Sequence, residues 1–72
     1  MKRKLTFQQE LALKCAKEGH AKYMDFIRAG ATSQSVTRLE RLGFLNKLTN
    51  MEKGNTWDIT EIGLRALRDG GY

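Results

Sequence analysis

The chain has 72 residues, enough for one domain, and a chain of this size buries only about 60% of the surface that its unfolded form exposes. So thin a core leaves little room for an enclosed pocket, which argues against an enzyme. The formal net charge is +5, and the excess of Lys and Arg lies within residues 1–45. This balance suits a polyanionic partner, either nucleic acid or an anionic membrane face, although a merely soluble basic protein has the same composition.

Cysteine content and the chain start predict where the protein works. Cys15 is the only cysteine, so no internal disulfide can form and a reducing compartment is expected. The basic start MKRK is not followed by an apolar run of signal-peptide length, and no segment approaches the roughly 18 apolar residues of a membrane span. We therefore expect a cytoplasmic protein without a membrane segment. When it binds nucleic acid, it would be associated with the nucleoid.

A first helix is predicted over residues 6–18. Thr6 and Gln9 match a capping box, and Gly19 supplies a left-handed stop. Its apolar stripe at helical spacing, expected to face the core, consists of Phe7, Leu11, Ala12, Cys15 and Ala16.

A second helix is predicted over residues 21–29, ending at Gly30. We expect it to bury Tyr23, Met24, Phe26 and Ile27. His20 lies in the gap before it, and with no Cys or second His at ligand spacing it is interpreted as a turn or capping residue. No metal site is expected.

The third predicted helix covers residues 33–42, with Thr32 as its cap and Gly43 as its end. Two short strands, 45–49 and 56–59, flank the turn-rich linker NMEKGN and predict a β-hairpin. Thr60 then caps a last helix over residues 61–69, which stops at a double glycine. The fold expected is mostly α with a small β-hairpin (α+β).

The third helix has two chemically distinct sides. At 100° per residue, an apolar set of Val36, Leu39 and Leu42 opposes a polar arc of Ser33, Gln34, Thr37, Arg38 and Arg41. The arc contains no acidic residue, since Glu40 lies outside it. Arg, Gln, Ser and Thr are side chains that bind base edges and phosphates, and an α-helix fits the major groove of B-DNA. A solvated amphipathic face is the alternative interpretation.

The order of these pieces resembles the winged helix-turn-helix family of the MarR-like kind. Phe26, Gly30, Val36 and Leu39 are similar to a helix-turn-helix framework, although the position of Phe26 is typically alanine in the tight form of that motif. Leu42 with Gly43, then Trp57, Ile59, Thr60 and Gly63 stand where the family has the end of its recognition helix and its wing. The resemblance spans residues 6–69 and implies a three-helix core, a two-stranded antiparallel wing and a short C-terminal helix.

The resemblance also implies roles for individual residues. The third helix would lie in the major groove, with Gln34, Thr37 and Arg38 at base edges and Ser33 and Arg41 on phosphates or outer bases. The capping Thr32 is also expected among the DNA-binding residues. Lys47 and Lys53 of the wing would contact phosphates, although Glu52 near the wing tip opposes this. Apart from the resemblance, three consecutive basic residues before the first helix predict that residues 1–5 form a basic arm separate from the domain over residues 6–72. Its Lys2, Arg3 and Lys4 suit either the DNA backbone or a disordered solubilising tail.

These observations predict a sequence-specific protein that binds double-stranded DNA, acting as a small phage or bacterial transcriptional regulator, a repressor or an excision accessory factor. One module of this size rarely binds DNA tightly alone, so a homodimer or side-by-side assembly is expected, with Ile62 and Leu64 as a possible oligomer surface. The alternatives are a winged-helix protein-interaction module without DNA readout and an RNA or non-specific nucleic-acid binder. No enzyme motif and no cofactor signature is found.

Overall fold

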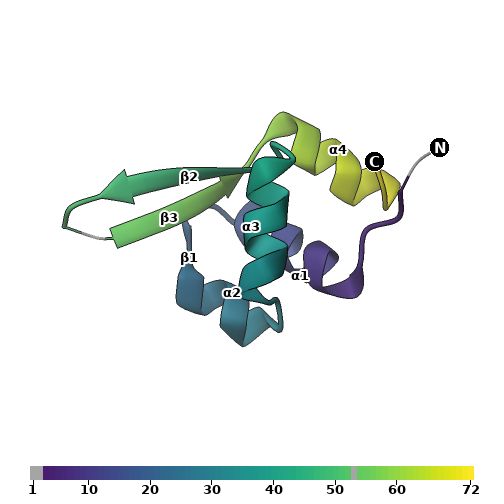
Figure 1. Cartoon of the computed structure of the whole chain (residues 1–72). Helices are drawn as coiled ribbons and strands as arrows, with labels where there is room; N and C mark the ends of the chain where they lie inside the picture. The colour runs from purple at the N-terminus through teal and green to yellow at the C-terminus, as the bar shows by residue number, and fades with distance from the viewer. Residues whose placement is uncertain (1–2, 53) are drawn as a thin grey trace.

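The computed structural model describes residues 3–52 and 54–72, and within them the fold is α+β. The helices are α1 (Phe7–Lys17), α2 (Tyr23–Ala29), α3 (Ser33–Arg41) and α4 (Glu61–Asp69). The strands are β1 (Ala21–Lys22), β2 (Leu45–Asn50) and β3 (Gly54–Ile59), which form an antiparallel sheet in the order β1-β3-β2. Figure 1 shows α3 at the centre, α1 and α4 on one side of it, and the β2–β3 hairpin projecting from the other.

Threonine caps fix the starts of three helices. The hydroxyl of Thr6 accepts a hydrogen bond from the backbone N–H of Gln9 (3.2 Å), and the Gln9 amide oxygen accepts one from the Thr6 N–H (3.0 Å). This confirms the predicted capping box. Thr32 and Thr60 cap α3 and α4 in the same way, because each hydroxyl accepts from the N–H three residues on.

A third strand replaces the predicted start of the second helix. Ala21 and Lys22 pair with Trp57 and Thr56 of β3, so the expectation of a two-stranded sheet was wrong. His20 explains the pairing, because its left-handed backbone (φ 49°) turns the chain and its N–H donates to Asp58 Oδ1 at 2.7 Å. The chain therefore runs beside β3 before α2 begins.

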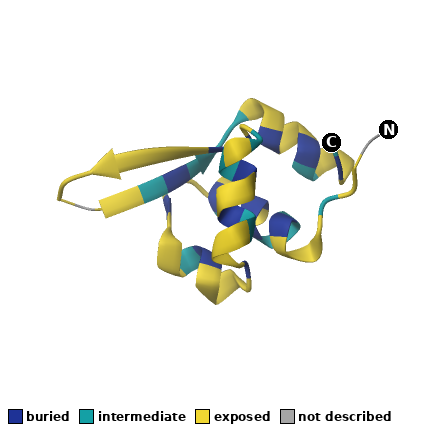
Figure 2. Ribbon diagram, viewed as in Figure 1, coloured by how far each residue is buried: buried dark blue, intermediate teal, exposed yellow. Residues whose placement is uncertain are grey.

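The core collects around α1, which contacts α2, α3, α4 and β3. Figure 2 shows the buried residues where these elements meet. Phe26 is fully buried and meets the Trp57 ring edge to face, with 5.7 Å between centroids. Among the described residues, the buried apolar cluster consists of Ala12, Leu13, Ala16, Ala21, Phe26, Ala31, Val36, Leu39, Phe44, Leu45, Trp57 and Ala66.

Two of the predicted helix faces were wrong in part. The buried side of α1 consists of Gln9, Ala12, Leu13 and Ala16, whereas Phe7 is 70% exposed. The reason is that the side of α1 that meets α2, α3, α4 and β3 is the side of Ala12 and Ala16, whereas Phe7 lies about 140–180° away from these two residues around the helix. In α2 only Phe26 is buried, and the other three expected core residues, Tyr23, Met24 and Ile27, are 40–56% exposed.

A close contact holds α4 against the end of α3. A Cβ on Gly63 would collide with the carbonyl oxygen of Phe44 and crowd the side chain of Ile59. Thr60 reinforces this corner, since its hydroxyl donates to the Gly43 carbonyl oxygen at 2.6 Å and its N–H donates to the Phe44 oxygen at 3.0 Å. The corner fixes the direction in which the hairpin returns to the domain.

Candidate nucleic-acid interface

The apolar side of α3 fixes which of its residues face outward. Val36 and Leu39 are buried, and Leu42 packs against the same core, as the sequence pattern predicted. The preceding turn is closed by Gly30, whose left-handed backbone (φ 98°) ends α2. With its inner face anchored and its start capped by Thr32, α3 presents its opposite side to solvent.

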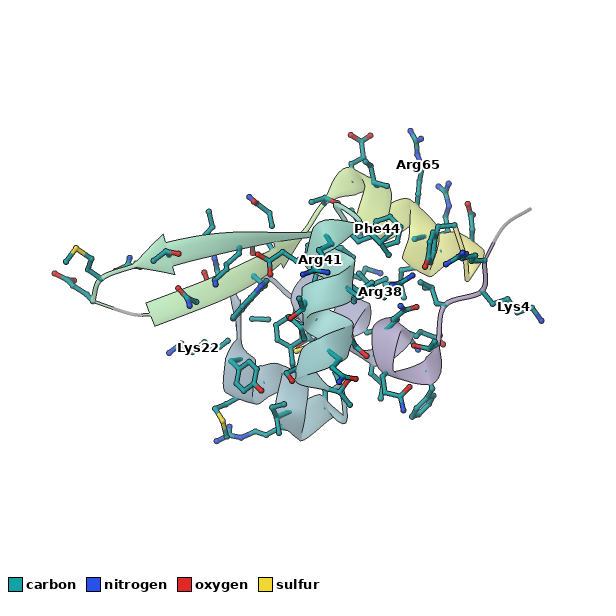
Figure 3. All side chains as sticks on the ribbon, viewed as in Figure 1. Lys4, Lys22, Arg38, Arg41, Phe44 and Arg65 are labelled. Atoms are coloured by element: carbon teal, nitrogen blue, oxygen red, sulfur yellow. The ribbon has the colours of Figure 1, made fainter. Side chains whose placement is uncertain are left out.

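The five residues of the predicted polar arc are all exposed, and they share one shallow surface depression of about 370 Å³. Figure 3 shows Arg38 and Arg41 side by side on the outer side of α3. No acidic side chain lines this depression. Its lining consists of Ser33, Gln34, Thr37, Arg38 and Arg41, a set that we call the α3 polar face.

A second depression, of about 410 Å³, extends the α3 polar face toward the start of α1. It shares Gln34 and Arg38 with the first depression and adds the exposed Gln8. No acidic residue lines this depression either. Gln8 was not predictable as part of this surface, because nothing local to it signals that α1 begins beside α3. The remaining lining residues are Thr6, Gln9, Thr32 and Ser35.

The only acidic residue of α3 lies on the side of the sheet. Glu40 is half-buried, and its Oε2 accepts a long hydrogen bond, 3.5 Å, from the indole N–H of Trp57. Lys47 covers the same ring from β2, with its Nζ 5.8 Å from the ring centroid. The carboxylate is therefore engaged beside the α3 polar face and leaves that face free of negative charge.

The predicted wing contacts divide between the body and the tip of the hairpin. Lys47 lies against Trp57, close to the domain, and is exposed to solvent. Lys53 lies outside the described residues. At the described part of the tip, the Asn50 side-chain oxygen accepts from the Glu52 N–H at 2.8 Å, and Met51 is fully exposed.

The backbone of the described basic residues in the N-terminal segment pairs with the backbone at the C-terminal end of the chain. Lys4 forms a bridge with Gly71, and Arg3 and Tyr72 exchange backbone hydrogen bonds, the Tyr72 N–H donating to the Arg3 oxygen at 2.8 Å. Figure 3 shows the Lys4 side chain pointing away from the domain near this end. Lys2 lies outside the described residues. The backbone of residues 3–5 is thus part of the fold, and both described basic side chains are exposed.

The two residues considered for an oligomer surface do not form one patch. Ile62 is 58% and Leu64 41% exposed. They are two positions apart on α4, which corresponds to about 200° around a helix. Between them lies the buried strip of Gly63 and Ala66, so the two side chains flank that strip on opposite sides.

No described helix is long and apolar enough to cross a membrane. The chain was compared with family models, with curated proteins and with solved structures, and none of them matches it.

Proposed function

We propose that this chain is a sequence-specific double-stranded DNA-binding domain of the winged helix-turn-helix type, acting as a transcriptional regulator, a phage-type repressor or an excision accessory factor. In this proposal α3 enters the major groove, and the β2–β3 hairpin is the wing. The observation that supports it best is the α3 polar face, whose five exposed residues share one depression without an acidic member. A surface that only needed to be solvated would not require the exclusion of carboxylates.

The chemistry of the α3 polar face fits the major groove. Arg38 suits the O6 and N7 acceptors of guanine, Gln34 suits adenine N6 and N7, and the Thr37 methyl group suits the thymine methyl. Ser33 at the start of α3 and Arg41 at its end then lie toward the phosphates, which carry no sequence information but set the orientation.

Basic side chains flank α3 on both sides and suit the two phosphate backbones of the groove. Lys47 stands on the sheet side, and Lys4 stands beyond α1. Such contacts release counterions, so the proposed complex weakens steeply as salt increases. Because a single module of this size buries little DNA surface, side-by-side binding or dimer formation on DNA belongs to the proposal.

The test is a selection of randomised DNA duplexes against the purified protein, followed by titrations of the enriched duplex at several salt concentrations. We expect an enriched motif. Replacing Arg38 by alanine should then weaken binding by about 1–3 kcal/mol and relax the base preference at one position. The matched control is Arg65→Ala, which removes the same charge from α4, where Figure 3 shows the side chain far from Arg38 and Arg41.

Two outcomes contradict parts of the proposal. If no motif is enriched and Arg38→Ala and Arg65→Ala weaken binding equally, base readout fails and only electrostatic attraction remains. If the folded protein binds no duplex even at low salt, DNA binding fails altogether, and the alternative of a winged-helix protein-interaction module takes its place.

A further inference from the structure

The outer side of α2 is an unexpected apolar surface. Tyr23, Met24 and Ile27 are 44%, 56% and 40% exposed. At about 100° per residue these three positions fall within one sector of roughly 100°, and Phe26, which enters the core, lies about 60° outside the Tyr23 edge of that sector. Three large apolar side chains on one sector of a seven-residue helix form a continuous surface, which we call the α2 apolar face.

The two exposed charged residues of the segment that carries the α2 apolar face are both basic, while Glu18 and Asp25 line a depression with Arg28 beyond the edge of that face. Lys22 precedes it and Arg28 follows within the helix, and both are exposed. Neither forms an ion pair with another described residue. The one acidic residue of α2, Asp25, is half-buried, and its carboxylate accepts a hydrogen bond from the Lys22 N–H at 2.9 Å. That carboxylate is engaged at the helix start and lies outside the apolar sector.

The basic residues beside the α2 apolar face disfavour a second copy of the chain as the partner that covers this face. A two-fold contact between two α2 apolar faces would bring Lys22 and Arg28 of each copy toward the same charges of the other, and like charges across an interface oppose association. A chain with a net charge of +5 adds to that repulsion. An apolar surface with a basic rim instead complements a segment with apolar residues at helical spacing and acidic residues beside them.

We propose that the α2 apolar face is a docking surface for an acidic amphipathic helix of a partner protein. The partner's apolar side chains would pack on Tyr23, Met24 and Ile27, while its carboxylates would meet Lys22 and Arg28. In Figure 1, α2 lies at the lower end of the domain, and Figure 3 places Arg38 and Arg41 on the body of α3. The two surfaces belong to different helices, so this proposal does not depend on DNA binding.

The test uses a displayed library of amphipathic helical peptides. Apolar positions vary among aliphatic and aromatic residues, and the positions beside them vary among Glu, Gln and Lys. Selection against the whole protein should enrich Glu beside the apolar stripe. A synthesised winner, titrated into isotopically labelled protein, should shift amide resonances of residues 21–29 more than those of α3 and α4. Its affinity should fall as salt increases.

Two variants at exposed positions sharpen the test without touching the core. Ile27→Glu should weaken the selected peptide at least tenfold, because it places a carboxylate in the apolar sector. Arg28→Glu should weaken it and favour a matched peptide in which Lys replaces every Glu. The control is Ile62→Glu, the same change at an exposed position of α4, which should leave peptide affinity unchanged. Circular dichroism confirms that each variant is folded.

The proposal is overturned if no peptide is enriched, if Lys-bearing peptides are enriched instead, or if the shifted resonances lie outside α2. Concentration-dependent shifts of α2 without peptide, abolished by Ile27→Glu, would assign the face to self-association and also overturn it. Duplex titrations of Ile27→Glu separate this inference from the proposed function, since DNA affinity should be retained while peptide binding is lost.

Discussion

Phe26 shows how one side chain connects the elements of the candidate DNA-binding unit. The tight form of the helix-turn-helix that the sequence resembles has alanine at this position, whereas the Phe26 ring fills the space between α2 and the sheet and meets Trp57 edge to face. The indole of Trp57 in turn donates to Glu40 of α3. The Phe26–Trp57 contact and this hydrogen bond together connect α2, the hairpin and α3.

Cys15 provides a prediction at the scale of one residue. Burial raises the pKa of its thiol above the ordinary value, and the nearby carboxylates of Asp25 and Glu18 raise it further. Because the thiolate is the reactive form, Cys15 should react with a disulfide reagent more slowly than glutathione does near neutral pH. Equal rates for the protein and glutathione would contradict this prediction.

The same shift determines how stability depends on pH. The folded state holds the thiol proton more tightly than the unfolded chain, so the contribution of Cys15 to stability is full below about pH 8.5 and is lost as the pH rises through the higher folded value. Urea unfolding of the wild type and of Cys15→Ala checks the sign. Any advantage of the wild type over the variant should shrink as the pH rises into the alkaline range.

At the scale of elements, the corner between α3 and α4 depends on one hydroxyl. Thr60 accepts from the Gly63 N–H at 3.1 Å and donates to the Gly43 oxygen at 2.6 Å. Thr60→Val keeps the shape but loses both bonds, and we expect it to lower the free energy of unfolding by about 2 kcal/mol. Thr60→Ser keeps the hydroxyl and should retain most of the stability. Urea unfolding midpoints test the difference, and equal losses would assign the effect to packing of the methyl group.

The elements also show which features a sequence alone can predict. Helix ends were predictable because Thr6, Thr32 and Thr60 bond to N–H groups only three residues away. Strand β1 was not, since Ala21 and Lys22 are extended only through pairing with residues more than thirty positions distant. Local pattern determines where a helix begins, but the neighbours determine whether a short segment becomes helix or strand.

Which helix residues are exposed likewise depends on neighbouring elements as well as on the local sequence pattern. The inner side of α3 was predictable, because Val36 and Leu39 repeat at helical spacing on a helix that packs along its length. On α2, Tyr23, Met24 and Ile27 carry the same kind of apolar signal, but this short helix meets the core mainly through Phe26. The five residues of the α3 polar face were predictable as a set, whereas the depression extending to Gln8 depends on how α1 and α3 pack.

At the scale of the whole molecule, the two described ends close on each other. The Leu5 N–H donates to the Gly70 oxygen at 3.1 Å, and the Tyr72 ring meets Phe44 edge to face with 5.1 Å between centroids. A Cβ on Gly71 would collide with the Arg3 carbonyl oxygen, which shows how closely the two terminal segments approach each other. In a domain with so small a core, this closure both adds buried surface and orients the basic residues that precede α1.

Tyr72→Ala should therefore open this closure as well as lower stability. The variant loses a half-buried aromatic ring and its contact with Phe44. We therefore expect its free energy of unfolding to be lower by about 1–3 kcal/mol. For a domain of this size, each kcal/mol lowers the melting temperature by about 4–8 °C. Tyr23→Ala, at a more exposed tyrosine on α2, is the matched control and should lower the free energy of unfolding less.

Hydrogen exchange separates a local from a global effect of Tyr72→Ala. The amide of Leu5 should lose protection in Tyr72→Ala while those of α1 keep it, because only the former depends on the closed ends. If protection falls equally in both places, the ends do not open separately and Tyr72 acts only through the common core.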